Sequence, residues 1–222
     1  LSFVIAIIVC HFLLFFIIEI IDIFLLLLLF PLLLMGNLDK KRLDTDLHVL
    51  QEIVALNPHI NQDDPLRIGT QIWDNGRLTY LNLFSEGIVS LPENLGDLTN
   101  LVYLNLELNQ LTTVPESLCD LINLEELYLS DNLLIYLPEN ISNLVNLEEL
   151  YFANNQITYL PESIYKLPIL NTLRMNDNQL IALPDSIGLL SNLETLSSSR
   201  NQLFDLPQSI VDLENLSILI LS

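Results

Sequence analysis

The side chains with the clearest potential for chemistry are two pairs of adjacent glutamates, Glu125–Glu126 and Glu148–Glu149, separated by 23 residues. Two carboxylates can act as general acid and general base when their surroundings differ and exclude water. The sequence around them alternates like an open strand surface, where nothing would desolvate them. Because no histidine, phosphate-binding glycine loop or metal-spaced cluster accompanies them, we predict a non-enzyme without catalytic, cofactor-binding or metal-binding residues.

The remaining reactive residues are isolated in the sequence. His48 and His59 precede the region of the glutamates and have no clustering partner. Cys10 and Cys119 lie in regions of different composition, so they define no disulfide framework and leave the redox compartment open. We interpret Cys119 as a small residue that fits on the return side of a structural unit.

The glutamate pairs belong to a repeat with a constant period of 23 residues. Apolar residues recur at positions one, four, six, eleven, fourteen, eighteen and twenty-one, and proline stands at position fifteen of every complete unit. Six units are complete and a seventh is truncated, with first residues Leu78, Leu101, Leu124, Leu147, Leu170, Leu193 and Leu216. We therefore assign residues 78–222 to a repeat array, in which each unit buries its apolar face against the next.

Positions four and six of each unit alternate as a short strand does, so the stacked units should form a parallel sheet with strands about 4.8 Å apart. The proline fixes its own φ and prevents an earlier helix start, which leaves a short, irregular return path. Position nine is asparagine in five units: Asn109, Asn132, Asn155, Asn178 and Asn201. An amide both donates and accepts, so we interpret this column as a structural ladder that satisfies buried backbone groups.

This pattern resembles the leucine-rich repeat family, with the motif LxxLxLxxNxLxxLPxxIxxLxx standing at residues 147–169. It is similar to the short LP-containing class of Ras-suppressor-like, Scribble-like and plant intracellular Ras-group proteins, and to bacterial arrays. The stretch WDNGRLTYLNL at residues 73–83 also resembles the entry to extracellular arrays. The resemblance implies an α/β solenoid, a horseshoe with a concave parallel sheet and a short, irregular or 3-10 convex side. It also implies protein binding through the concave side.

Two positions depart from the pattern. Glu86 replaces the ladder asparagine in the first unit, where an end unit tolerates a solvated carboxylate. Ser198 occupies an apolar core position of the sixth unit. By analogy with large-to-small core changes, Ser198 should be a defect of about 2–4 kcal/mol.

The side chains that should project from the sheet stand at positions two, three, five, seven and eight. In the middle units these positions combine tyrosines with carboxylates, and tyrosine is enriched at interface hot spots. We predict a binding site on the concave face composed of Tyr80, Tyr103, Glu125, Glu126, Tyr128, Glu148, Glu149, Tyr151 and Arg174.

Charge restricts the class of partner. The chain has a formal net charge of −20, and residues 78–222 carry nineteen acidic residues against three basic ones. Such a surface repels phosphate backbones and anionic membranes, so nucleic acid is excluded as a partner. A protein partner with basic character is favoured, although acidity also serves solubility.

Two further segments precede the array. Residues 1–35 form a hydrophobic leader, in which the run at residues 3–18 has about the length of a membrane helix. No basic residue precedes the run, no A-x-A-like cleavage site follows it, and Lys40–Arg42 come after it. Three interpretations stay open: a signal or anchor with an incomplete N-terminus, one tilted or re-entrant helix with Lys40–Arg42 on the cytoplasmic side, or an over-extended reading frame that starts at Met35.

Residues 36–77 should cap the open end of the array. A helix is predicted here by the helical spacing of Leu47, Leu50, Ile53 and Val54. Its N-cap oxygen could come from Asp44, Thr45 or Asp46. The helix should end at Asn57–Pro58. Trp73 is expected to cover the first unit.

The sequence thus predicts a protein-binding module that is membrane-associated or exported, using residues 3–35 for attachment. Two alternatives are a cytoplasmic scaffold of the Ras-group kind and the recognition arm of an enzyme whose catalytic domain follows residue 222. The seventh unit ends without a cap, which favours a longer natural protein.

Overall fold

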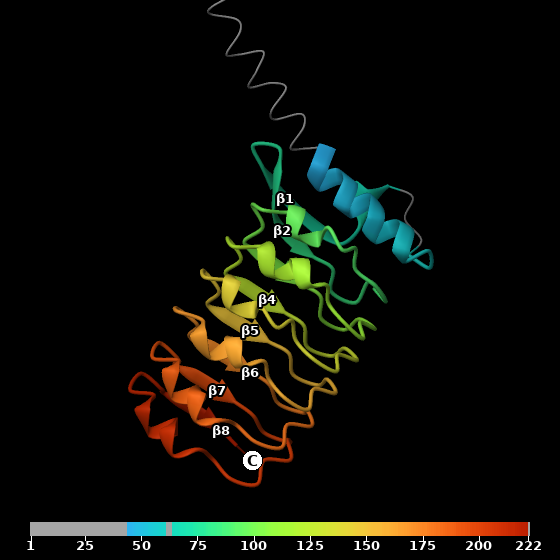
Figure 1. Cartoon of the computed structure of the whole chain (residues 1–222). Helices are drawn as coiled ribbons and strands as arrows, with labels where there is room; N and C mark the ends of the chain where they lie inside the picture. Colours follow the sequence, from blue (N-terminus) through green and yellow to red (C-terminus); the bar gives the residue numbers. More distant parts are fainter. Residues whose placement is uncertain (1–43, 61–63, 222) are drawn as a thin grey trace, which may run out of the picture. The chain divides into compact units, whose positions relative to one another are not determined.

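The repeat units form one continuous sheet in the computed structural model, which describes residues 44–60 and 64–221. Its strands follow chain order: β1 (Thr70–Asp74), β2 (Arg77–Asn82), β3 (Tyr103–Asn105), β4 (Glu126–Tyr128), β5 (Glu149–Tyr151), β6 (Thr172–Arg174), β7 (Thr195–Ser197) and β8 (Ile218–Ile220). From β2 onward all neighbours are parallel, and equivalent repeat positions pair, as Leu104 with Leu127. The predicted parallel sheet is confirmed (Figure 1).

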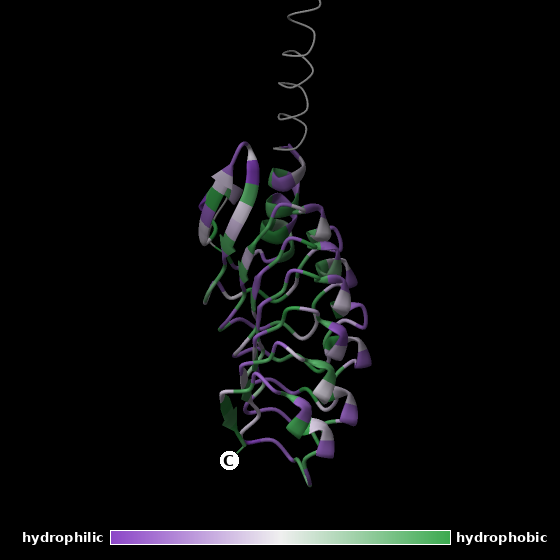
Figure 2. Ribbon diagram, turned by 90° about the vertical axis from the view of Figure 1, so that its left-hand side faces the viewer, coloured by the Kyte–Doolittle hydropathy of each residue, from purple (hydrophilic) through white to green (hydrophobic). Residues whose placement is uncertain are grey.

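The return path of each of the six complete units contains a short 3-10 helix on the side away from the sheet (Figure 2). These segments are η1 (Pro65–Arg67) before the array and then η2 (Leu95–Asp97), η3 (Glu116–Asp120), η4 (Ile141–Asn143), η5 (Glu162–Lys166), η6 (Asp185–Leu189) and η7 (Gln208–Asp212). The position-fifteen proline is the N-cap of η3, η5, η6 and η7, with φ between −64° and −75°. The proline therefore sets the start of the return segment, as its fixed φ predicts.

Leucine columns fill the space between the sheet and the 3-10 segments. In the middle units, Leu127, Leu129, Leu134, Leu144 and Leu147 are fully buried. Each such side chain stabilises the fold by about 1.5–3 kcal/mol relative to an exposed one. Packing between consecutive units thus maintains the stack.

The asparagine ladder connects each unit to the preceding one. The side-chain Nδ2 of Asn132 donates to the carbonyls of Leu106, Leu129 and Ser130 at 2.8–3.1 Å. Its Oδ1 accepts from the backbone amide of Leu111 at 3.0 Å. Asn109, Asn155, Asn178 and Asn201 repeat this arrangement in their own units. The predicted structural role of this column is confirmed.

A left-handed backbone conformation recurs immediately before the ladder. Leu108, Asp131, Asn154, Asp177 and Arg200 have φ between 52° and 55°. Aspartate and asparagine tolerate this region because their short side chains bond locally, whereas leucine and arginine adopt it less readily. The turn geometry therefore explains why Asp or Asn stands at three of these five positions.

The predicted capping helix is present over residues 44–56 and ends before Asn57–Pro58, as expected. Val49, Leu50 and Ile53 are fully buried, whereas Val54 is only partly buried. Trp73 is also only partly buried, so the helix, more than this tryptophan, covers the first unit.

Asp44, Thr45 and Asp46 all lie within the described part of the helix, and the residues before Asp44 lie outside the described residues, so the N-cap assignment stays a prediction. Asp46 is fully buried, and its Oδ2 accepts from the Leu78 amide at 2.8 Å and from Arg77 Nε at 2.9 Å. Asp46 therefore joins the helix to the first unit of the array.

The leader at residues 1–35, the basic cluster at Lys40–Arg42 and the start at Met35 lie outside the described residues. Within residues 44–60 and 64–221, no helix has both the length and the hydropathy needed to cross a membrane.

Ser198 is 1% exposed, and its Oγ has no hydrogen-bond partner within the described part of the chain. Leucine, phenylalanine or methionine occupies this position in the other units. We expect Ser198→Leu to raise the free energy of unfolding by about 2 kcal/mol, since it removes an unpaired polar group and restores apolar burial. Chemical denaturation measures this change, and Ser199→Leu at the next, less buried position is the control. An unchanged or lower stability of Ser198→Leu would show that the position has no room for the larger side chain.

Candidate functional site

Four tyrosines contact one another in a row across strands β2 to β5. The ring centroids of Tyr80 and Tyr103 are 4.1 Å apart with an interplanar angle of 11°, so these rings are stacked. Tyr103 and Tyr128 are tilted at 5.3 Å, and Tyr128 and Tyr151 meet edge-to-face at 4.7 Å. All four side chains are half-buried on the sheet face. Aromatic pairs in these geometries contribute about 0.5–1.5 kcal/mol beyond area burial, which orders the row.

Arg174 of strand β6 terminates the row. Its guanidinium carbon lies 4.9 Å from the centroid of the Tyr151 ring, within cation–π distance. We call Tyr80, Tyr103, Tyr128, Tyr151 and Arg174 together the tyrosine stripe. Parallel register explains its continuity, since Tyr80 pairs with Tyr103 and Tyr128 with Tyr151 in the backbone ladder.

Two carboxylates converge on the centre of the stripe. The Tyr128 hydroxyl lies 2.7 Å from Glu126 Oε2 and 2.9 Å from Glu149 Oε2. Burial raises the pKa of Tyr128 above its usual value, and the hydrogen bonds to these two glutamates raise it further. The hydroxyl therefore keeps its hydrogen at physiological pH.

Seven of the nine predicted site residues lie on strands of the sheet, whereas Glu125 and Glu148 immediately precede β4 and β5. Glu126 and Glu149 contact Tyr128, whereas Glu125 and Glu148 stand at position two and are exposed. Glu148 Oε2 accepts from Asn171 Nδ2 at 3.3 Å. The nine residues thus divide into the stripe with its two carboxylates and an exposed outer pair.

Two asparagines support the stripe and were not predicted. Nδ2 of Asn105 donates to the Tyr103 hydroxyl at 3.3 Å, and Nδ2 of Asn82 donates to the Tyr80 hydroxyl at 3.5 Å. Each asparagine stands two residues after its tyrosine on the same strand. That spacing puts the asparagine and the tyrosine on the same face of the strand, and it is the sequence signal from which this contact could have been predicted.

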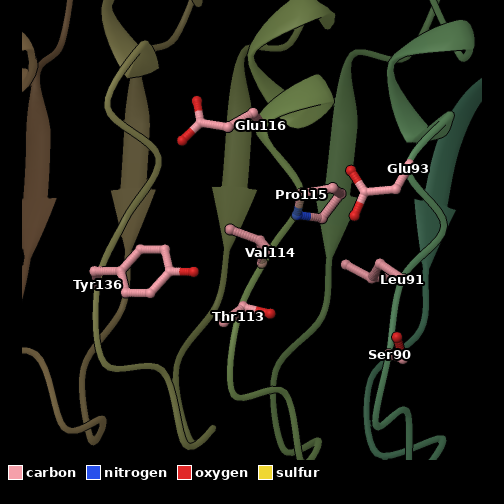
Figure 3. Close-up of a pocket in the computed structure, with 8 residues that line it drawn as sticks. All are labelled: Ser90, Leu91, Glu93, Thr113, Val114, Pro115, Glu116 and Tyr136. Carbon is pink, nitrogen blue, oxygen red and sulfur yellow. The ribbon is translucent and has the colours of Figure 1, made fainter.

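Two shallow pockets lie outside the sheet and were not predicted either. The first has a volume of about 250 Å³ and is lined by Ser90, Leu91, Glu93, Thr113, Val114, Pro115, Glu116 and Tyr136 (Figure 3). The second, of about 490 Å³, extends between the capping helix and the first unit, with Leu56 and Pro92 among its lining residues. Their lining holds no histidine or cysteine, so neither contains a nucleophile–base pair of the usual kind.

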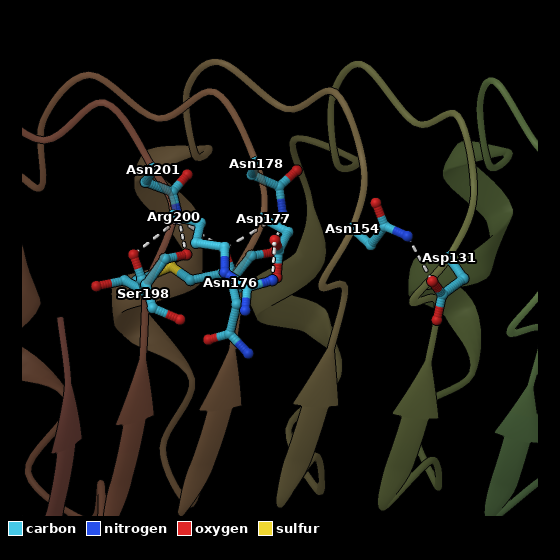
Figure 4. Close-up of polar contacts among 10 residues, drawn as sticks. Asp131, Asn154, Asn176, Asp177, Asn178, Ser198, Arg200 and Asn201 are labelled. Carbon is cyan, nitrogen blue, oxygen red and sulfur yellow. Dashed lines mark hydrogen bonds and ion pairs between the residues drawn. The ribbon is translucent and has the colours of Figure 1, made fainter. Parts of the chain in front are cut away.

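Polar contacts between neighbouring turns border the sheet (Figure 4). Asn154 Nδ2 donates to Asp131 Oδ1 at 2.5 Å, and Arg200 forms an ion pair with Asp177 at 3.0 Å. Both contacts join residues in the left-handed turn conformation. They connect adjacent units at the surface, and exposed pairs of this type contribute little to stability.

Cys119 and His48 lie outside the tyrosine stripe. Cys119 lies in η3 and is 1% exposed, and burial raises its pKa to about 12, with Glu116 and Asp120 contributing. Its thiol is therefore not ionised at neutral pH. His48 pairs with Glu52 at 3.2 Å, and the described residues contain no group of three or more side chains suited to a metal ion.

The fold and this site are those of a solenoid repeat protein with an exposed sheet face. Residues 74–134 match the family model for the leucine rich repeat, and residues 122–168 match the model for two copies of leucine rich repeats. The chain is a leucine-rich repeat protein. No curated protein sequence matches it significantly.

Solved structures agree with this assignment. A leucine-rich repeat protein of Leptospira interrogans is 33% identical to this chain, with a TM-score of 0.55. The match covers 65% of this chain and 43% of the Leptospira protein. The plant peptide hormone receptor RGFR1, solved in complex with RGF2, is 31% identical with a TM-score of 0.55. The match covers 65% of this chain and 24% of the receptor chain.

A third solved structure is the ectodomain of the membrane receptor kinase GASSHO1/SCHENGEN3 from Arabidopsis thaliana, in complex with CASPARIAN STRIP INTEGRITY FACTOR 2. It is 28% identical with a TM-score of 0.61, and the match covers 80% of this chain and 26% of the ectodomain chain. The chain spans less than half the length of each of these three structures. The matches support the class of a protein-interaction module.

Proposed function

We propose that this chain binds a protein or peptide partner through the concave sheet face, with the tyrosine stripe at the centre of the contact. The observation that carries the proposal is the uninterrupted row of ring contacts from Tyr80 to Arg174 across five strands. Rigid aromatic side chains offer a large contact area at a low entropic cost, which is typical of interface hot spots. Two of the similar plant receptors are solved with ligands, RGF2 and CASPARIAN STRIP INTEGRITY FACTOR 2.

Charge supports a basic partner. Glu125, Glu126, Glu148 and Glu149 flank the stripe on strands β4 and β5 or immediately before them. Complementary charge accelerates association and suppresses acidic competitors. Nucleic acid is disfavoured as a partner by the net charge of −20.

Loss of two central rings should strongly reduce partner capture. We expect Tyr128→Ala combined with Tyr151→Ala to reduce capture from a lysate of the source organism by about tenfold or more, since hot-spot truncations cost about 2 kcal/mol or more each. Quantitative mass spectrometry of proteins retained by the immobilised chain provides the measurement.

The matched control is Tyr136→Ala combined with Tyr159→Ala, because these tyrosines are exposed and lie outside the sheet. Circular dichroism should show that both variants remain folded. Full capture by the stripe variant, or equal loss in both variants, would refute the stripe as the binding site.

We also propose that the module acts outside the cell or at a membrane. The apolar residues 3–35 and the likeness to the ectodomain of a plant membrane receptor kinase support this placement. Fractionation of native cells tests it, and recovery in the soluble cytoplasmic fraction would instead favour the scaffold of the Ras-group kind.

A further inference from the structure

The centre of the sheet face has more acceptors than donors. Glu126 Oε2 and Glu149 Oε2 both lie within 3 Å of the Tyr128 hydroxyl, which has a single hydrogen. An ionised carboxylate only accepts, so that hydrogen can point fully toward one of the two glutamates. The Tyr151 hydroxyl also bonds Glu149, but two hydroxyl hydrogens do not fill the acceptor positions of four carboxylate oxygens, which leaves room for a donor from outside the chain.

The chain does not neutralise these two charges with its own cations. The ion pairs within residues 44–60 and 64–221 involve Glu52, Asp64, Asp46 and Asp177, and neither glutamate of the stripe is among them. Arg174, the nearest cation along the stripe, lies over the Tyr151 ring instead. This contact demonstrates that a guanidinium group can occupy the ring surface at one end of the stripe.

We propose that the sheet face recognises an arginine side chain presented by an extended segment of the protein partner. Its guanidinium group sits between the carboxylates of Glu126 and Glu149 beside Tyr128. The inference rests on the proposed function and specifies the chemistry that the partner must offer. Charge complementarity selects a cation, because the surrounding face also carries Glu125 and Glu148.

Guanidinium fits this surface better than ammonium for two physical reasons. Its planar fork can donate to two carboxylates at once, whereas ammonium is a point charge. It also stacks on aromatic rings. Because it is more weakly hydrated than ammonium, it loses less hydration free energy when it leaves water. The sheet face should therefore discriminate between arginine and lysine.

The test uses N-acetyl-L-arginine methylamide as the probe, with its citrulline and lysine counterparts for comparison. The intact chain is labelled with ¹³C in its tyrosine rings, and the ring signals are followed by NMR during each titration. We expect the signals of Tyr128 and Tyr151 to shift with the arginine probe at millimolar concentrations, while those of Tyr136 and Tyr159 stay constant. The uncharged citrulline probe should cause no shift, and the lysine probe a smaller one.

Matched variants separate local recognition from general electrostatics. Glu126→Gln with Glu149→Gln and Glu125→Gln with Glu148→Gln remove the same formal charge. The first pair should weaken the apparent affinity for arginine at least about tenfold, as loss of charge-assisted hydrogen bonds predicts, and the second should change it less than about twofold, as expected for exposed charges. Equal effects of both pairs, or equal shifts with arginine and citrulline, would overturn the inference. In that case a loss of partner capture by the Tyr128→Ala and Tyr151→Ala variant would still support the proposed function.

Discussion

Replacing Asn132 with alanine is expected to lower the free energy of unfolding by about 3 kcal/mol, because it leaves the buried Leu111 amide without a partner and removes a donor from three carbonyls. The side chain is 5% exposed and forms four hydrogen bonds, one to the Leu111 amide and three to carbonyls. Within the described residues the Leu111 amide has no other acceptor, whereas the three carbonyls keep donors from Asn109, Asn155 and the Leu108 amide. An unpaired buried amide accounts for most of the expected loss. Urea denaturation followed by circular dichroism measures the loss.

Asn123→Ala is the matched control. This asparagine is exposed, and its Nδ2 donates to the carbonyl of Thr99 at 2.8 Å. Its loss should cost about 1 kcal/mol or less, as for an exposed hydrogen bond. Similar losses for the two variants would contradict the structural role assigned to the ladder.

Replacing Asp46 with alanine should have an effect of comparable size at the other end of the array. The carboxylate is fully buried, and its loss leaves both the Leu78 amide and the largely buried Arg77 guanidinium without this partner. Breaking a buried pair in this way costs about 3–5 kcal/mol. We expect the capping helix at residues 44–56 to lose protection in hydrogen exchange before the array does.

The control for this experiment is Glu52→Ala on the same helix. Glu52 pairs with His48 at 3.2 Å, and both side chains are substantially exposed. Its loss should cost less than about 0.5 kcal/mol, as exposed ion pairs do. If Asp46→Ala left the exchange of the helix unchanged, the buried ion pair would not be what attaches the cap.

The sheet, its register and the ladder could be predicted from sequence because a constant period fixes them. Leu104 and Leu127 pair because they occupy the same position in consecutive units, and any slip would expose the leucine columns. The same register brings Tyr80 beside Tyr103 and Tyr128 beside Tyr151.

The contact between Tyr103 and Tyr128 was not predictable from that register. These residues occupy positions three and five of adjacent units, so only their side-chain rotamers bring the rings to 5.3 Å. The role of Asp46 was missed for a related reason. A local helix pattern indicates a cap oxygen near the helix start, whereas its partners Arg77 and Leu78 are more than thirty residues away.

Site-specific photo-crosslinking tests most directly whether the sheet face is where the partner binds. A benzophenone amino acid is placed at Glu148 on the sheet side or at Glu162 in η5, two exposed glutamates in the same repeat unit. Irradiation in the native host should yield a discrete protein adduct from position 148 and none from position 162. An adduct from position 162 alone would show that the partner contacts the convex side and would contradict the binding role of the tyrosine stripe.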